Sequence, residues 1–217
     1  MHTDEYSPGR SADLYGDVGR ATVLMWHGAQ TDSRAAMRPL AERVHERGAA
    51  VVLADWDSHA DDRGRADLLA SAGYAADRAG GSPLILVGWS MGGLAAAGLT
   101  LHARHIQVAH TVCLAGAFMV PDPISGVRLP NELDGDAVPF TLLHGERDDV
   151  VPVGVSREFA ATLEGNGWPV SCVVLAADHG SIAGATYDPA ADSYSAADDP
   201  SALAVADDVA ARIAAVL

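Results

Sequence analysis

The sequence contains no lysine: all 14 basic residues among its 217 are arginine. This absence excludes three kinds of active site, namely a Schiff-base lysine, the phosphate-binding lysine of a P-loop and a nucleophilic serine paired with lysine. The 29 acidic residues give a formal net charge of −15. A chain this negative is repelled by phosphate backbones and by anionic lipid surfaces, so we expect neither nucleic acid nor a membrane as a partner.

Cysteine is scarce, and long apolar runs are missing. Cys113 and Cys172 each lie inside a short apolar run, and we expect buried free thiols rather than a disulfide or a zinc site. No run approaches the roughly 18 apolar residues of a membrane span. The polar N-terminal segment 1–20 lacks the apolar core of a signal peptide. We therefore expect a cytoplasmic protein.

The chain does contain enough apolar residues for a core, because 49% of it is hydrophobic. Short apolar runs alternate with segments of helical spacing. The expected strands are 21–26, 49–54, 84–87, 108–114, 138–143 and 170–175, and the expected helices are 31–47, 63–79, 91–103, 153–163 and 199–216. This alternation predicts a single α/β domain over 1–217, with a mainly parallel sheet of six or more strands and helices on both faces. The segments 115–137 and 181–198 have no regular pattern.

Ligand sites in parallel sheets lie at the carboxyl ends of the strands, and a serine stands there after the third expected strand. Gly88-Trp89-Ser90-Met91-Gly92 has the G-x-S-x-G pattern between a strand and a helix. The sharp turn presents the serine Oγ above the sheet, and glycines on either side avoid crowding it. The Met91 N–H, at the start of the helix, is suited to stabilising an oxyanion. We therefore expect Ser90 to be a nucleophile.

A serine nucleophile needs a base, and chain order narrows the choice among nine histidines. Behind such a serine the acid comes next and the histidine last. His144 and His179 alone follow the fourth expected strand, and His144 precedes every acidic residue of its own loop. His179, just beyond the last strand, is the histidine that meets this order.

The acid should follow the fifth expected strand, where three acidic residues compete. They are Glu146, Asp148 and Asp149. The acid accepts a hydrogen bond from the histidine Nδ1–H and fixes its tautomer. The residues by themselves leave this choice open.

The segment from His144 to Pro152 resembles the H-G-x-x-D-x-x-V-P pattern of α/β-hydrolase esterases. That resemblance implies that Asp148 is the acid. His27-Gly28 resembles the oxyanion segment of the same family, which implies the N–H of Ala29, or alternatively that of Gln30, as an oxyanion donor beside Met91. His27 itself is expected to be structural. The resemblance covers about 21–217 and is greatest to small members without a lid, such as dienelactone-hydrolase-like proteins and compact carboxylesterases.

The resemblance implies a serine hydrolase that cleaves carboxylic esters of small molecules through an acyl-enzyme. A thioesterase or amidase with the same three residues is the alternative, and a binding protein that kept the fold is a third reading. No metal and no organic cofactor is implied, and the sequence carries no signal of oligomeric state.

The connection 115–137 bears on the size of the substrate. Its prolines at 121, 123 and 130 disfavour a helical lid, so it should form only a short cap loop. We expect an open, shallow site walled by Trp89, Met119, the turn 55–57 and the loop after His179. Such a site predicts short acyl groups of roughly two to six carbons, because little remote binding energy is available to a long chain.

Overall fold

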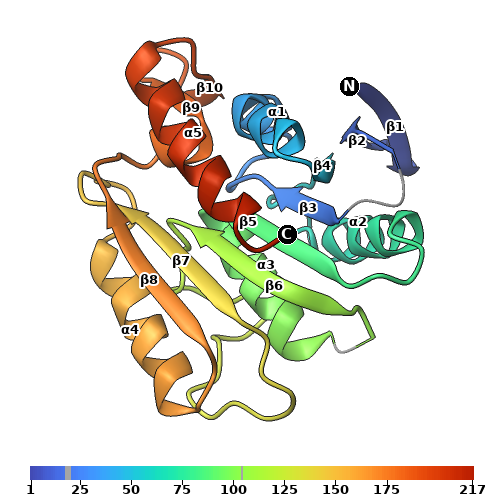
Figure 1. Cartoon of the computed structure of the whole chain (residues 1–217), viewed down its shortest axis with the longest axis vertical. Helices are drawn as coiled ribbons and strands as arrows, with labels where there is room; N and C mark the ends of the chain where they lie inside the picture. The colour runs from blue at the N-terminus through green and yellow to red at the C-terminus, as the bar shows by residue number, and fades with distance from the viewer. Residues whose placement is uncertain (18–20, 104) are drawn as a thin grey trace.

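A computed structural model describes residues 1–17, 21–103 and 105–217. Its main sheet has eight strands in the order β1-β2-β4-β3-β5-β6-β7-β8 (Figure 1). The strands are β1 (His2–Ser7), β2 (Arg10–Tyr15), β3 (Thr22–Trp26), β4 (Ala50–Ala54), β5 (Leu84–Trp89), β6 (Val108–Leu114), β7 (Phe140–Gly145) and β8 (Val170–Leu175). Within the sheet, the six neighbouring strands β4-β3-β5-β6-β7-β8 pair in parallel. The pairs β1–β2 and β2–β4 are antiparallel.

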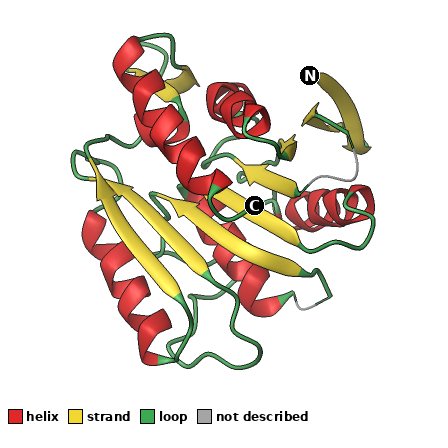
Figure 2. Ribbon diagram, in the orientation of Figure 1, coloured by secondary structure: helices red, strands yellow, loops and turns green. Residues whose placement is uncertain are grey.

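Helices cover both faces of this sheet (Figure 2). The helices are α1 (Arg38–Glu46), α2 (Arg65–Arg78), α3 (Met91–His102), α4 (Val153–Gly165) and α5 (Pro200–Ala214). Apolar side chains of α1 and α5 form one core with the sheet, and those of α2, α3 and α4 pack against its other face. The expected mainly parallel, doubly covered sheet is therefore confirmed.

The N-terminal segment, expected to be polar and without an element, forms the hairpin β1–β2. Pro8 and Gly9, the latter at φ 76°, supply its turn. Ala12 and Leu14 are buried, and β2 pairs with β4. Asp13, between these two residues, makes the run look polar in the sequence. It can nevertheless be buried, because its carboxylate pairs with Arg38 at 2.8 Å. Residues 18–20 of the same expected segment lie outside the described residues.

The expected loop 181–198 also contains a hairpin, formed by β9 (Ala185–Asp188) and β10 (Ser193–Ala196) after the short 3₁₀ turn η2 (Ser181–Ala183). Most of its side chains are exposed, so an apolar pattern is weak and the sequence gives little sign of it. The hairpin packs over a second 3₁₀ turn, η1 (Arg34–Met37), which replaces the first turns of the expected helix 31–47. It therefore lies beside the segment that follows β3.

One expectation about the cysteines is wrong. Cys113 is buried in β6, as expected, but Cys172 is exposed. Cys172 lies on β8, an edge strand of the sheet, where its apolar neighbours are only partly buried.

The connection 115–137, every residue of which is described, consists of turns without a helix or strand. Asp122 holds it together, since its buried carboxylate accepts hydrogen bonds from the N–H groups of Ile124 and Ser125 at 2.8 and 2.9 Å. Arg65 of α2 donates to the Ile124 carbonyl at 2.8 Å. The expected short cap loop is therefore tied down on the sheet's helical layer.

Among the described residues, no helix combines the length and the apolar character needed to cross a membrane.

Candidate active site

Ser90 occupies the sharp turn between β5 and α3. Its backbone has φ 56° and ψ −117°, a region that residues other than glycine rarely adopt. The Ser90 N–H donates to the Leu114 carbonyl at 2.8 Å, and the Ser90 carbonyl accepts from Gly93 and Ala117, each at 3.1 Å. Bonds to two neighbouring segments thus hold the strained conformation in place.

The flanking glycines are required by close backbone approaches. A Cβ at Gly88 would overlap the backbone of Gly92, and a Cβ at Gly92 would overlap the carbonyls of Trp26 and His27. The expectation that larger side chains would crowd this turn is confirmed. The missing side chain of Gly92 lets the start of α3 lie against the end of β3, and that of Gly88 lets the same helix start lie against β5.

His179 and Asp148 come together at the carboxyl ends of β7 and β8. The His179 Nδ1–H donates to Asp148 Oδ2 at 2.8 Å, and His179 is 3% exposed. The indole N–H of Trp89 donates to the His179 carbonyl at 2.8 Å, and the two rings lie 5.5 Å apart. The residue just before Ser90 therefore holds the histidine beside the serine turn. Trp89 is 2% exposed, and its expected contact with substrate stays a prediction.

Asp148 is held more firmly than its two competitors. Its Oδ1 accepts from the N–H groups of Val150 and Val151 at 2.9 and 2.8 Å. Burial by itself would raise the pKa of Asp148, but hydrogen bonds from His144, His179 and Val151 outweigh it and hold that pKa well below its usual range. The Asp148 carboxylate is therefore charged. Glu146 and Asp149 are exposed.

A second histidine, for which the sequence pattern predicts no role, supports the same carboxylate. His144 is fully buried, with Nε2 2.8 Å from the Val151 carbonyl and 3.3 Å from Asp148 Oδ2. Its Nδ1 lies 2.7 Å from Ser156 Oγ, in α4. His144 thus fixes the loop that carries Asp148. Its place four residues before Asp148 was the one signal in the sequence.

The segment after β3 lies against the serine. A Cβ on Gly28 would lie 3.3 Å from the Ser90 Cβ, which puts Ala29 next to the site. The carbonyl of Gln30 accepts from the Ser58 N–H at 3.1 Å, and that of Thr31 accepts from Arg10 at 3.2 Å. Neighbouring loops therefore fix the segment that carries both candidate donors.

His27 anchors the start of this segment. Its Nδ1–H donates to the Gly28 carbonyl at 2.7 Å, and its Nε2 accepts from the Trp56 N–H at 3.2 Å. These bonds require the neutral ring, and burial lowers its pKa to about 4. The structural role expected for His27 agrees with these contacts.

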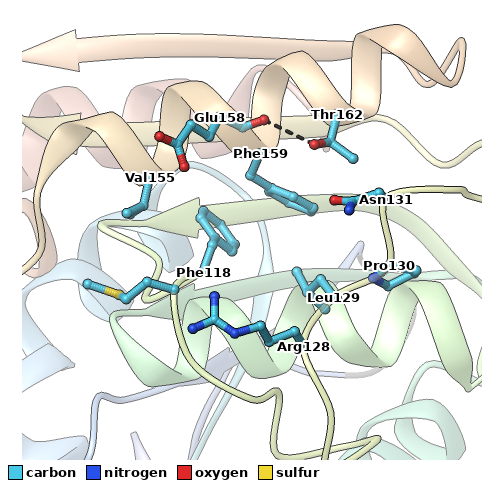
Figure 3. A pocket seen from close by; sticks show the side chains of 10 residues that line it. Phe118, Arg128, Leu129, Pro130, Asn131, Val155, Glu158, Phe159 and Thr162 are labelled. Atoms are coloured by element: carbon cyan, nitrogen blue, oxygen red, sulfur yellow. Dashed lines mark hydrogen bonds between the residues drawn. The ribbon is translucent and has the colours of Figure 1, made fainter.

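A cavity of about 310 Å³ lies between the cap loop and α4 (Figure 3). Met119 lines it, and Phe118 and Phe159 meet there with ring centroids 4.3 Å apart. The chain reaches the cavity directly from Ala117, whose N–H bonds Ser90. The expected wall at 55–57 is different in character, since the Asp55 carboxylate is buried and bonded to Arg34 at 2.7 Å.

Within 1–17, 21–103 and 105–217, no group of three or more histidine, cysteine, aspartate or glutamate side chains could hold a metal ion.

No protein-family model matches the chain, and no curated protein matches its sequence. Solved structures do resemble it. MGS-M1, an α/β hydrolase enzyme from a Medee basin deep-sea metagenome library, has 18% identity and a TM-score of 0.69, with 83% of each chain covered. Esterase Est2 of Thermogutta terrifontis with propionate bound has 17% identity and a TM-score of 0.67 over 98% of this chain and 94% of that one. Est1E of Butyrivibrio proteoclasticus has 18% identity and a TM-score of 0.66, covering 100% and 98%. The chain therefore has the α/β-hydrolase fold.

Proposed function

We propose that the protein hydrolyses carboxylic esters of small molecules, with Ser90 as nucleophile, His179 as base and Asp148 as the acid that orients it. His179 Nε2 takes the Ser90 proton while Oγ attacks the ester carbonyl. The same proton then passes to the leaving alcohol, which leaves an acyl group on Ser90. Water, deprotonated in its turn by His179, releases the carboxylic acid and restores the serine.

The observation that carries the proposal is the pairing of a strained serine with a bonded histidine–carboxylate pair at one end of the sheet. Ser90 has φ 56°, and His179 Nδ1 lies 2.8 Å from Asp148 Oδ2. Nδ1 is occupied by the carboxylate, so proton transfer falls to Nε2. Positive φ at a non-glycine residue stores strain that is typical of functional sites. The Trp89 N–H bond to the His179 carbonyl links the two halves.

The oxyanion of the tetrahedral intermediate falls to two backbone N–H groups, those of Met91 and Ala29. Met91 opens α3, and the first N–H groups of a helix have no partner within it. Ala29 follows Gly28, whose approach to Ser90 is close. Preorganised donors of this kind contribute about 10²–10³ in rate each.

The acyl group of the ester binds in the cavity lined by Phe118 and Met119. Its volume of about 310 Å³ suits a small group, and Phe118, Met119 and Phe159 supply apolar surface in a lining that also includes Arg128 and Glu158. Est2, which shares the fold, was solved with propionate bound. We therefore propose short acyl groups as the preferred substrates.

Steady-state kinetics with p-nitrophenyl butyrate tests the proposal. Ser90→Ala should reduce kcat to a small residual rate over water, since the oxyanion donors and binding remain. Ser82→Ala, which changes an exposed serine after α2, is the matched control and should keep the activity of the unchanged protein. The corresponding butyrate thioester and anilide in the same assay separate an esterase from a thioesterase or amidase. Near-normal kcat in Ser90→Ala would overturn the assignment.

A further inference from the structure

A second and larger cavity, of about 550 Å³, opens beside His179. His179 itself forms part of its wall, and the hairpin β9–β10 contributes Tyr187 and Tyr194. This cavity shares no lining residue with the one in Figure 3, which belongs to the cap loop and α4. The two cavities therefore offer separate places for the two halves of an ester.

We propose that the cavity beside His179 holds the alcohol half of the ester and selects alcohols that carry a cationic group, such as a quaternary ammonium, over anionic ones. The inference rests on the proposed function. In that mechanism His179 returns its proton to the leaving oxygen, so the alcohol must lie against the histidine ring. The acyl half falls to the other cavity, which the chain reaches from Ala117 next to Ser90.

Aromatic rings form one side of this cavity. Tyr194 packs edge-on against Trp89 at 4.9 Å and lies 6.0 Å from the His179 ring. The Tyr187 ring lies tilted against that of Tyr194, with ring centroids 5.0 Å apart, and Tyr187 remains 44% exposed. Packing thus fixes the rings next to the histidine and leaves one of them open. Tyrosine faces attract ammonium groups within about 6 Å of the ring centre.

The charged residues around the rest of this cavity are mainly acidic. Its lining residues include three aspartates, Asp149, Asp178 and Asp192, against a single basic residue, Arg147. The Asp192 carboxylate accepts from the Tyr187 hydroxyl at 2.6 Å, which keeps it beside the rings. Burial, followed by the charges of Asp148, Asp149 and Asp178, raises the pKa of Tyr194 to about 12. The field that opposes a phenolate there also opposes an anionic alcohol.

Three butyrate esters of similar size provide the test: choline butyrate, 3,3-dimethylbutyl butyrate and 3-sulfopropyl butyrate. They carry a positive, a neutral and a negative alcohol. Each kcat/KM is divided by the rate constant for hydroxide-catalysed hydrolysis of the same ester, which removes differences in intrinsic reactivity. We expect the corrected value for the cation to exceed that of its neutral isostere by on the order of tenfold at low salt, and the anion to fall below it. Both ratios should shrink as salt screens the charges.

A double variant, Asp149→Asn with Asp192→Asn, locates the effect. Asparagine tolerates the positive φ of 47° at position 192 and can still accept from Tyr187. The cation-to-neutral ratio should fall severalfold in this variant. A change in the reactivity of His179 would alter kcat/KM for both esters alike, so it cancels in this ratio. Asp61→Asn with Asp77→Asn changes the net charge equally at exposed residues outside the cavity lining and should keep the original ratio.

The outcomes separate this inference from the proposed function. Hydrolysis of p-nitrophenyl butyrate with equal corrected values for the three esters would overturn the inference and leave the function intact. A charge preference that survives in the double variant, or one lost equally in the control pair, would also overturn it. Failure to hydrolyse any ester faster than Ser90→Ala would overturn both.

Discussion

His144 and His179 both contact the Asp148 carboxylate, whereas the neighbouring Glu146 and Asp149 are exposed. Substitutions of these three acidic residues should therefore differ in their effect on activity. Asp148→Asn puts an amide where the His179 Nδ1–H needs a negative acceptor, which favours the wrong tautomer. We expect kcat on a neutral ester to fall by about 10⁴, as in a comparable triad. Circular dichroism and the unfolding midpoint show whether the variant remains folded.

Glu146→Gln is the matched control, because Glu146 is 58% exposed on its side chain and lies two residues away. It should keep most of the activity, and Asp149→Asn should lose far less than Asp148→Asn on the same ester. Equal losses at Asp148 and Asp149 would mean that the acid is misassigned by one residue.

His27 makes stability depend on pH, because its ring is neutral and fully enclosed. The folded state lowers its pKa from 6.5 to about 4. Between these values the unfolded chain binds the proton and the folded one does not, so this contribution is present above pH 6.5 and is lost as pH falls towards 4. At pH 5 the loss should be about 2 kcal/mol.

Urea unfolding of the unchanged protein and of His27→Gln at pH 7 and pH 5 measures this effect. Other groups contribute to acid sensitivity in both proteins, so the difference between them isolates the histidine. The unchanged protein should lose more free energy of unfolding than the variant does. Identical losses would contradict the account of His27.

At the scale of elements, the contact between β5, β3 and the start of α3 depends on glycine. Gly92→Ala forces a Cβ into the carbonyls of Trp26 and His27, which are backbone and cannot swing away. We expect a loss of about 1–3 kcal/mol in unfolding free energy, typical of overpacking. Activity should fall as well, since Met91 and Ser90 belong to the same turn.

Gly73→Ala is the opposite case within another helix. Gly73 lies inside α2, and a Cβ there would meet nothing within 4 Å. Alanine should stabilise the protein by about 0.5–1 kcal/mol, because glycine loses more conformational freedom on folding. Chemical unfolding of the two variants side by side shows whether the unfolding free energy falls in Gly92→Ala and rises in Gly73→Ala. A Gly92→Ala protein as stable as Gly73→Ala would refute the packing argument.

The elements that could be predicted are those whose burial is continuous. β6 and β8 have the bounds expected from their apolar runs, and the helices differ from expectation mainly at their ends. The two hairpins could not be predicted, for different reasons. In β2 the buried Asp13, paired with the more exposed Arg38, makes a core strand look polar in the sequence. The strands β9 and β10 are short and mostly exposed, so they show no apolar pattern.

The candidate site likewise contains residues that the sequence predicts and residues that it does not. Local pattern and chain order are enough to select Ser90 and His179. Selection of Asp148 needed the resemblance to a family pattern, because only the folded loop reveals which carboxylate meets the histidine. His144 and the tyrosines of the hairpin were missed, because the sequence pattern does not show which side chains meet once the loop and the hairpin have folded.

For the whole molecule, we expect the cap loop to limit the size of the acyl group. Hydrogen bonds of Asp122 and Arg65 hold the loop in place, and an open cavity of about 310 Å³ lies between the loop and α4. Along the p-nitrophenyl ester series from acetate to palmitate, kcat/KM should be greatest at roughly two to six carbons, where the cavity is filled. No rise in activity is expected above the solubility limit of the ester. A maximum at about ten or more carbons would contradict the small acyl cavity.

The central claim is that Ser90 forms a covalent bond with the substrate carbonyl, and covalent trapping tests it most directly. A p-nitrophenyl phosphonate transfers its phosphonyl group to an activated serine and releases nitrophenol, so the adduct can be found by intact mass and peptide mapping. We expect one adduct, on the peptide that contains Ser90, and its formation should abolish ester hydrolysis. The adduct should be absent from Ser90→Ala and should form slowly in Asp148→Asn. Complete loss of hydrolysis with the adduct on another residue, or hydrolysis that persists after Ser90 is fully labelled, would contradict it.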